Sequence, residues 1–236
     1  MENINIKPFA NITKYKASRE AEDAFTVAAG GHFSHVYMLG QDRLPSAVFI
    51  EENAVADIHI FAFPGVTADV ALEIVLCGRN ATLSLSGAYI LGSDEKIRLA
   101  IDVFHEVPSC YSRQLFKGLV GGSAKADFYG KVIVAPDAQK AEAYQENHNL
   151  LLSADAKVNA RPQLEIYADD VKCSHGATVG RLNEEEQFYM RSRGITLEEA
   201  RALQMISFVS PVIAGLQEPL HEDLSARLDS AIRRLL

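Results

Sequence analysis

The chain has 236 residues, and its 48% hydrophobic content is enough for a sizeable core. Its formal net charge of -8 at pH 7 argues against a surface for nucleic acid or anionic membranes, because such a surface needs clustered Lys and Arg. No apolar stretch is long enough to span a bilayer, so no membrane association is expected.

Three cysteines, Cys77, Cys110 and Cys173, stand far apart in the chain, and no two of them form a C-x-x-C pair. Their odd number and wide spacing predict free thiols in a reducing compartment instead of a disulfide framework. Residues 1–8 contain no charged segment followed by an apolar one, so no signal peptide is predicted. The expected location is therefore the cytoplasm.

Residues 1–45 are predicted to form a short N-terminal segment ahead of the main body. His32 and His35 lie three residues apart there, a spacing that could bind a metal ion on a helix. The preceding Gly30 and Gly31 favour a turn, so the two side chains are interpreted as surface histidines.

Residues 46–180 form a series of short β-like runs broken by turn residues. The runs cover residues 47–50, 57–63, 70–76, 81–85, 96–103, 114–120, 128–134 and 163–167. Several of them alternate polar and apolar side chains, and no long helical period separates them. Many short strands at even spacing suit a sandwich, a barrel or a β-solenoid. The lack of Asn-Gly and Asp-Gly hairpin turns favours a mainly β fold built as a solenoid of parallel strands.

Several chemically suggestive residues of this body have simpler interpretations. His59 and His105 lie in or beside strand runs and are interpreted as hydrogen-bonded groups of the solenoid wall. Cys77 and Cys110 are interpreted as small buried hydrophobic residues. The segment 121–125 is Gly-Gly-Ser-Ala-Lys, which lacks the spacing of a phosphate-binding loop, so no ATPase activity is expected in this chain.

A thiol and an imidazole stand two residues apart in the segment 170–180, directly after an extended run. On a strand, Cys173 and His175 point to one face, whereas Lys172 and Ser174 point to the other. A thiolate and an imidazole together bind iron or zinc, or the imidazole activates the thiol. The spacing by itself favours a buried Cys beside a His bonded to the backbone, since so short a motif often arises by chance.

Three short helices are predicted in residues 181–236. Asn183 caps the first, which ends at Gly194, and Thr196 opens the second. The third runs from about residue 222 to residue 236 and carries apolar residues at helical spacing, namely Leu224, Leu228, Ile232 and Leu235. One interpretation is a helical cap over a sheet edge, because the ends of a solenoid need covering.

Together these residues resemble the SufB/SufD family of iron–sulfur cluster assembly scaffolds, and its D-type members above all. The similarity is carried by residues 162–180 (PQLEIYADDVKCSHGATVG) and 188–195 (FYMRSRGI), with shorter matches at 138–140, 144–145 and 150–153. Weaker similarity extends back through residues 116–118 towards Ser34. A match that joins strand, motif and helix in order is more specific than the C-x-H spacing, so it favours a functional site at Cys173 and His175.

The resemblance implies a right-handed parallel β-helix followed by a helical region. It implies a non-enzymatic scaffold that pairs with a SufB-type paralogue through the β-helix and with a SufC-type ABC ATPase through the helices. Such a complex accepts persulfide sulfur and builds a transient iron–sulfur cluster; a role for flavin stays open. His175 would lie at the subunit interface, and Cys173 would be a ligand or a sulfur relay. The residues expected near the ATPase are Phe188, Tyr189, Arg191, Arg193 and Gly194.

The cysteine content agrees with a site shared between subunits. A typical cluster takes four protein ligands, mostly thiolates, whereas this chain offers three scattered cysteines. A half-site completed across an interface is therefore expected. Family members carry a substantial region ahead of the β-helix, of which this chain has at most a few dozen residues, so its partners and stoichiometry stay open. Two other functions also stay open: a β-helix enzyme acting on carbohydrate, which would need grouped carboxylates, and a homodimer that binds metal without an assembly role.

Overall fold

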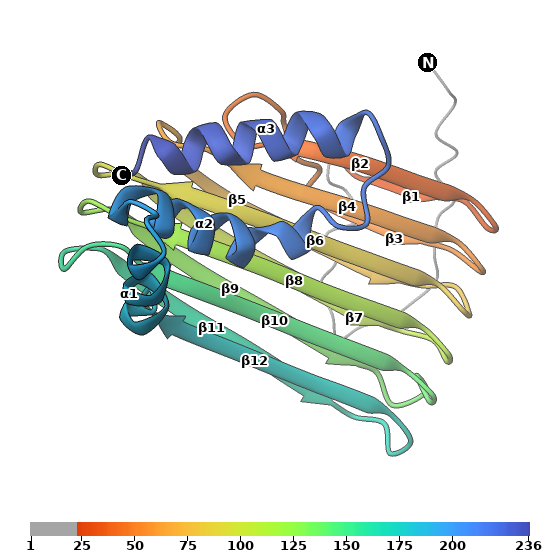
Figure 1. Ribbon diagram of the computed structural model, residues 1–236. Helices are drawn as coiled ribbons and strands as arrows, with labels where there is room; N and C mark the ends of the chain where they lie inside the picture. The colour runs from red at the N-terminus through yellow and green to blue at the C-terminus, as the bar shows by residue number, and fades with distance from the viewer. Residues whose placement is uncertain (1–22) are drawn as a thin grey trace.

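The computed structural model describes residues 23–236, which form two stacked parallel β-sheets with three helices on one side (Figure 1). The odd-numbered strands form one sheet, here called the odd sheet: β1 (Phe25–Val27), β3 (Ala47–Ile50), β5 (Ala68–Leu76), β7 (Lys96–His105), β9 (Lys125–Val134) and β11 (Lys157–Ile166). The even-numbered strands form the even sheet: β2 (His32–Met38), β4 (Val55–Ala62), β6 (Thr82–Leu91), β8 (Tyr111–Val120), β10 (Glu142–Leu151) and β12 (Lys172–Gly180). The chain thus alternates between the sheets, which confirms the predicted parallel β-solenoid.

Two features of the strand series were not anticipated. Strands β1 and β2 lie ahead of residue 46 and already pair in parallel with β3 and β4. Strand β10 covers a segment that contained no predicted run. The division at residues 46 and 180 stays a prediction, and the start of the chain, where no signal peptide is expected, lies outside the described residues.

One corner of the solenoid repeats the same backbone conformation in successive turns. A residue with positive φ occupies this corner each time, namely Gly30, Asn53, Asn80, Ser109 and Lys140. Glycine and asparagine adopt this left-handed conformation at low cost, which explains their presence here. The next residue faces inward and is small, and Cys110 takes this position where other turns have Ala54, Ala81 and Ala141. The prediction that Cys110 is a small buried hydrophobic residue is confirmed.

The interior of the solenoid changes from apolar to polar along the chain. Inward residues of β4 and β6, such as Ile58 and Leu85, are aliphatic and fully buried. On β8 and β10 the inward positions include four fully buried amides, Gln114, Gln145, Asn147 and Asn149. They bond mainly to one another and to Tyr89: Gln145 Nε2 donates to Gln114 Oε1 at 3.0 Å, and Asn147 Nδ2 donates to the Tyr89 hydroxyl at 3.2 Å. Burying a polar side chain costs free energy unless it is hydrogen-bonded, and these bonds offset that cost.

The helices cover a face of the even sheet. These are α1 (Glu184–Ser192), α2 (Leu197–Val209) and α3 (Leu220–Arg233), with the short 3-10 helix η1 (Ser210–Val212) between the last two. The outward residues Phe61, Ala88, Ile90 and Leu119 of β4, β6 and β8 pack against Met205, Val209, Leu224, Leu228 and Ile232 of the helices. The interpretation as a cap over a sheet edge is therefore wrong, because the apolar outward surface that needs covering lies on the sheet's face.

The predicted helix caps are confirmed. Asn183 Oδ1 accepts hydrogen bonds from the backbone N–H groups of Glu185 and Glu186, and Thr196 Oγ1 accepts one from that of Glu199. Gly194 ends the first helix with φ +89. None of the helices in the described part of the chain is both long and apolar enough to cross a membrane.

Two histidines of the strand series, His32 and His59, make hydrogen bonds that connect neighbouring parts of the structure. His32 and His35 lie on strand β2, just after a turn at residues 29–30, and both are exposed, which confirms them as surface histidines; their odd spacing sends them to opposite faces of the strand. His32 pairs with Asp57 at 2.7 Å. Ser86 donates its hydroxyl proton to the Val212 carbonyl, so His59 Nδ1 must donate to Ser86 Oγ, at 2.7 Å. His59 therefore helps to join the even sheet to η1.

The buried His105 makes the stability of the protein pH-dependent. Its Nε2 bonds to Ser112 Oγ at 2.7 Å, and burial lowers its pKa from 6.5 to about 4. Between these pH values the unfolded chain binds a proton that the folded chain rejects. The free energy of unfolding is thus fully retained above pH 6.5 and falls by about 1.4 kcal/mol per pH unit towards pH 4. Urea unfolding of the wild type and His105→Gln across this range should show a shallower pH slope in the variant; equal slopes would contradict the assignment.

Candidate functional site

The solenoid is open at its C-terminal end. Strands β11 and β12 are the last members of their sheets, and in residues 23–236 no further strand pairs with their outer edges. Three large apolar side chains near these strands are exposed, Ile166 by 42%, Tyr167 by 53% and Val179 by 47%. This end of the molecule therefore carries unpaired backbone groups together with apolar surface.

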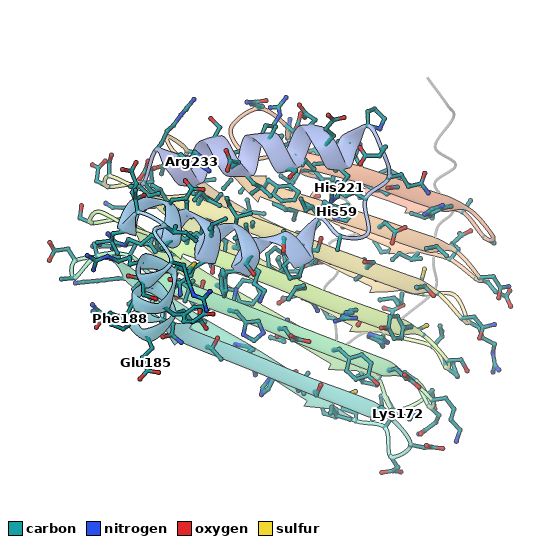
Figure 2. The ribbon with its side chains drawn as sticks, viewed as in Figure 1. His59, Lys172, Glu185, Phe188, His221 and Arg233 are labelled. Carbon is teal, nitrogen blue, oxygen red and sulfur yellow. The ribbon has the colours of Figure 1, made fainter. Side chains whose placement is uncertain are left out.

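Cys173 and His175 lie on β12 and face the interior at this open end. In the parallel register Cys173 is paired with Ala143 and His175 with Gln145, both of which are inward and fully buried on β10. Cys173 packs partly buried against the core, whereas His175 is exposed. The predicted common face of the two side chains is confirmed. Lys172, labelled at the start of β12 in Figure 2, lies on the outer face, where its Nζ bonds to Glu142 Oε1 at 2.8 Å.

The surroundings keep Cys173 protonated in the chain alone. Burial raises the pKa of the Cys173 thiol, and a hydrogen bond with the Ala143 backbone opposes this shift only in part. Lys172 points away and cannot stabilise the thiolate. A bound metal ion would deprotonate the thiol, since metal ligands bind as thiolates. In the described residues His175 makes no hydrogen bond, so its ring is free to bind a ligand.

The chain supplies too few ligands for a closed metal site. Within residues 23–236, no three His, Cys, Asp or Glu side chains come together so as to hold a metal ion. Cys77 and Cys110 lie on earlier turns of the solenoid, and their thiols bond to backbone carbonyl oxygens at 3.3 Å. Cys173 and His175 thus amount to half of a typical four-ligand site.

A row of side chains leads from the interior to His175. Leu85, Gln114, Gln145 and His175 are successive partners in the register of β6, β8, β10 and β12. The two glutamines are buried, and the imidazole is the exposed end of the row. Sequence reasoning missed Gln114 and Gln145 as neighbours of the site, because only the register aligns residues about thirty positions apart.

The five residues expected to contact a partner lie on or just after α1, at the other end of β12 from Lys172 (Figure 2). Phe188 is 72% exposed and Tyr189 59%, so neither belongs to the core. Arg193 lies 5.2 Å from the Tyr189 ring centroid and donates to its hydroxyl at 3.1 Å. Beside them, a groove of about 700 Å³ runs between α1, α2 and the end of β10, lined in part by Leu150, Leu182, Tyr189, Met190, Leu203 and Phe208. Arg191 lies in the last turn of α1.

The three thiols should differ in reactivity in the folded protein. Burial raises the pKa of Cys77 to about 12 and that of Cys110 to about 11, and both sit within the corner packing. Cys173 stands on an edge strand, where a reagent can approach. Brief treatment with iodoacetamide, followed by mass spectrometry of the peptides, should label Cys173 first. All three should react alike in urea, and labelling of Cys77 or Cys110 at the rate of Cys173 would contradict this order.

The fold and site define a class of protein: an open-ended parallel β-solenoid that offers an incomplete thiol–imidazole site at its end. Residues 34–208 match the sequence model of a family described as SUF system FeS cluster assembly, SufBD core domain. The chain belongs to this SufBD family of iron–sulfur cluster assembly proteins, as its sequence resemblance predicted.

Individual relatives agree with the D-type resemblance. The chain is 34% identical to the iron–sulfur cluster assembly protein SufD of Escherichia coli over 229 residues, which is 94% of this chain and 54% of that protein. It is 39% identical to SufD of Bacillus subtilis over 117 residues, 50% of this chain and 26% of that protein. A SufBD family protein of Synechocystis is 43% identical over 125 residues, 51% of this chain and 28% of the relative. The chain thus spans about half the length, or less, of these relatives.

Proposed function

We propose that this chain is the D-type scaffold subunit of a Suf iron–sulfur cluster assembly complex, and that its terminal turn supplies half of the assembly site. The observation that carries the proposal is the Cys173–His175 pair on the open end of the solenoid. In residues 23–236 no third His, Cys, Asp or Glu joins Cys173 and His175 in a group that could hold a metal ion, so the site requires a second subunit. The subunit acts as a scaffold in the cytoplasm and catalyses no reaction itself.

The partner at the open end is a SufB-type paralogue. The free edges of β11 and β12 offer backbone N–H and C=O groups that another solenoid's strands can extend, as in other strand additions. Ile166 and Val179 supply apolar surface beside these edges. Docking would bury His175 and Cys173 next to ligands of the paralogue, including a thiol of its own.

In the docked complex His175 and Cys173 have different chemical roles. His175 binds iron of the nascent cluster through a neutral ring nitrogen. Cys173 either binds iron as a thiolate, releasing its proton, or relays sulfur. In a relay its thiolate attacks the outer sulfur of a donor persulfide, so that a new persulfide forms on Cys173 and the donor leaves as a thiolate. The cluster is cargo and passes on to a client protein.

The helical region is the docking surface for a SufC-type ABC ATPase. Phe188 and Tyr189 are large, exposed and adjacent, and aromatic residues of this kind are frequent anchors at interfaces. Arg191, Arg193 and Gly194 flank them at the end of α1. ATP hydrolysis would belong to this partner.

The proposal is tested by anaerobic purification of the tagged full chain from its native host, with bound proteins identified by mass spectrometry. Recovery of a SufB-type paralogue and an ABC ATPase in stable ratio would support it. Val179→Asp should release the paralogue and retain the ATPase, whereas Phe188→Asp should do the reverse. Both positions are exposed, so neither variant should unfold the chain. Recovery of a homodimer alone, or loss of both partners from both variants, would overturn the assignment of the two surfaces.

A further inference from the structure

The interior of the solenoid holds a buried acceptor next to His175. Gln145 Oε1 and Gln114 Nε2 are fully buried, and neither has a hydrogen-bond partner. Between them lies the bond from Gln145 Nε2 to Gln114 Oε1, 3.0 Å long. Unpaired buried polar atoms are costly, so each one calls for an explanation, such as a functional contact, a bound water or an ion.

The packing fixes the position of the Gln145 amide. Gly130 of β9 lies opposite, and a Cβ there would lie 2.9 Å from Gln145 Cδ and would overlap its Nε2. The glycine thus provides the space into which the amide fits. With Nε2 committed to Gln114 on the preceding turn, Oε1 is the end of the amide that is left for another donor.

The other inward amides of β10 are already occupied. Asn147 bonds to Tyr89, and Asn149 Nδ2 donates to Asn147 Oδ1 at 2.7 Å. Gln145 is therefore the amide of this strand that keeps a buried, unpaired acceptor. Its register partner on the next turn is His175, whose ring nitrogens have no partner in the described residues.

We propose that Gln145 is a positioning residue for His175: Gln145 Oε1 accepts a hydrogen bond from one ring N–H, which leaves the other ring nitrogen free to bind a ligand beyond the open end. A ligating imidazole needs this kind of second contact, because the bond sets both its tautomer and its orientation. The inference rests on the proposed function only in treating His175 as a ligand.

The test compares Gln145→Met with Gln114→Met in the full chain labelled with nitrogen-15 at histidine. Both variants lose the same Gln–Gln hydrogen bond and gain the same side chain, so their stabilities should fall alike. Only Gln145→Met removes the acceptor for His175. In the wild type and Gln114→Met, the ring N–H of His175 should exchange slowly with water and its χ1 should occupy one rotamer. In Gln145→Met, exchange should be about two- to tenfold faster and the rotamer averaged.

A measurement on the wild type needs no substitution. A nuclear Overhauser contact between the His175 ring N–H and the Gln145 side-chain amide is expected, and it remains available if a variant fails to fold. No such contact, or equal effects of the two variants on His175, would overturn the positioning role. These measurements involve no cluster, so normal cluster assembly by His175→Ala would refute the proposed function and leave this inference standing.

Discussion

Replacing His175 with Ala should abolish the contribution of this chain to cluster assembly while leaving its fold intact. The imidazole is exposed, and its removal loses at most the one hydrogen bond to Gln145 inferred above, so the free energy of unfolding should fall by no more than about 1.5 kcal/mol. Loss of a ligand should slow maturation of iron–sulfur client proteins at least about tenfold. The measurement is client activity in cells that lack every other assembly system.

Ser174→Ala is the matched control for His175→Ala. Ser174 is exposed on the same strand but points to the outer face, so its loss should leave maturation unchanged. Cys173→Ser would separate the two members of the pair, since a relay requires sulfur at this position. Normal maturation in the His175→Ala strain would show that the imidazole is not a ligand.

Gly78→Ala should destabilise the protein strongly without touching the site. Gly78 lies at the corner after β5, where a Cβ would overlap the backbone nitrogen of Glu52 and the carbonyl carbon of Glu51 on the preceding turn. Backbone atoms of a stacked turn cannot move aside as a flexible side chain can. The expected cost is about 3 kcal/mol, measured by urea unfolding.

A second glycine substitution gives the comparison for Gly78→Ala. Gly215 has no atom within 4 Å of an added Cβ and does not have a positive φ. Gly215→Ala should therefore change the stability by no more than about 0.5 kcal/mol, or raise it slightly by restricting the unfolded chain. If Gly78→Ala and Gly215→Ala lowered the free energy of unfolding equally, the close packing at the corner of Gly78 would be refuted.

Much of the architecture could be read from the chain because local patterns specify it. Alternating strand runs without hairpin turns predicted the parallel solenoid, and Asn183, Gly194 and Thr196 marked helix boundaries correctly. Strand β10 was missed because its inward positions are Gln145, Asn147 and Asn149. An alternation rule that expects apolar inward residues cannot find a strand whose interior face is polar.

The same limits apply to the helices and histidines. On α2 the large apolar residues Leu197 and Leu203 are exposed, whereas Ala202 and Met205 are buried. Which face a helix buries depends on the surface it meets, here the apolar outer face of β4, β6 and β8. His32 and His35 lie on a strand because β2 pairs with β4, and the local sequence does not predict this pairing.

The strand-rich solenoid, the capped helices and the common face of Cys173 and His175 follow from local patterns, since all of these depend on neighbours close in the chain. The position of the pair at an open end and the burial of Gln145 behind His175 depend on contacts between distant segments. The reason is register: parallel strands about thirty residues apart align through the length and conformation of every intervening corner. A shift of one residue would turn each side chain to the opposite face and separate the imidazole from the buried amide.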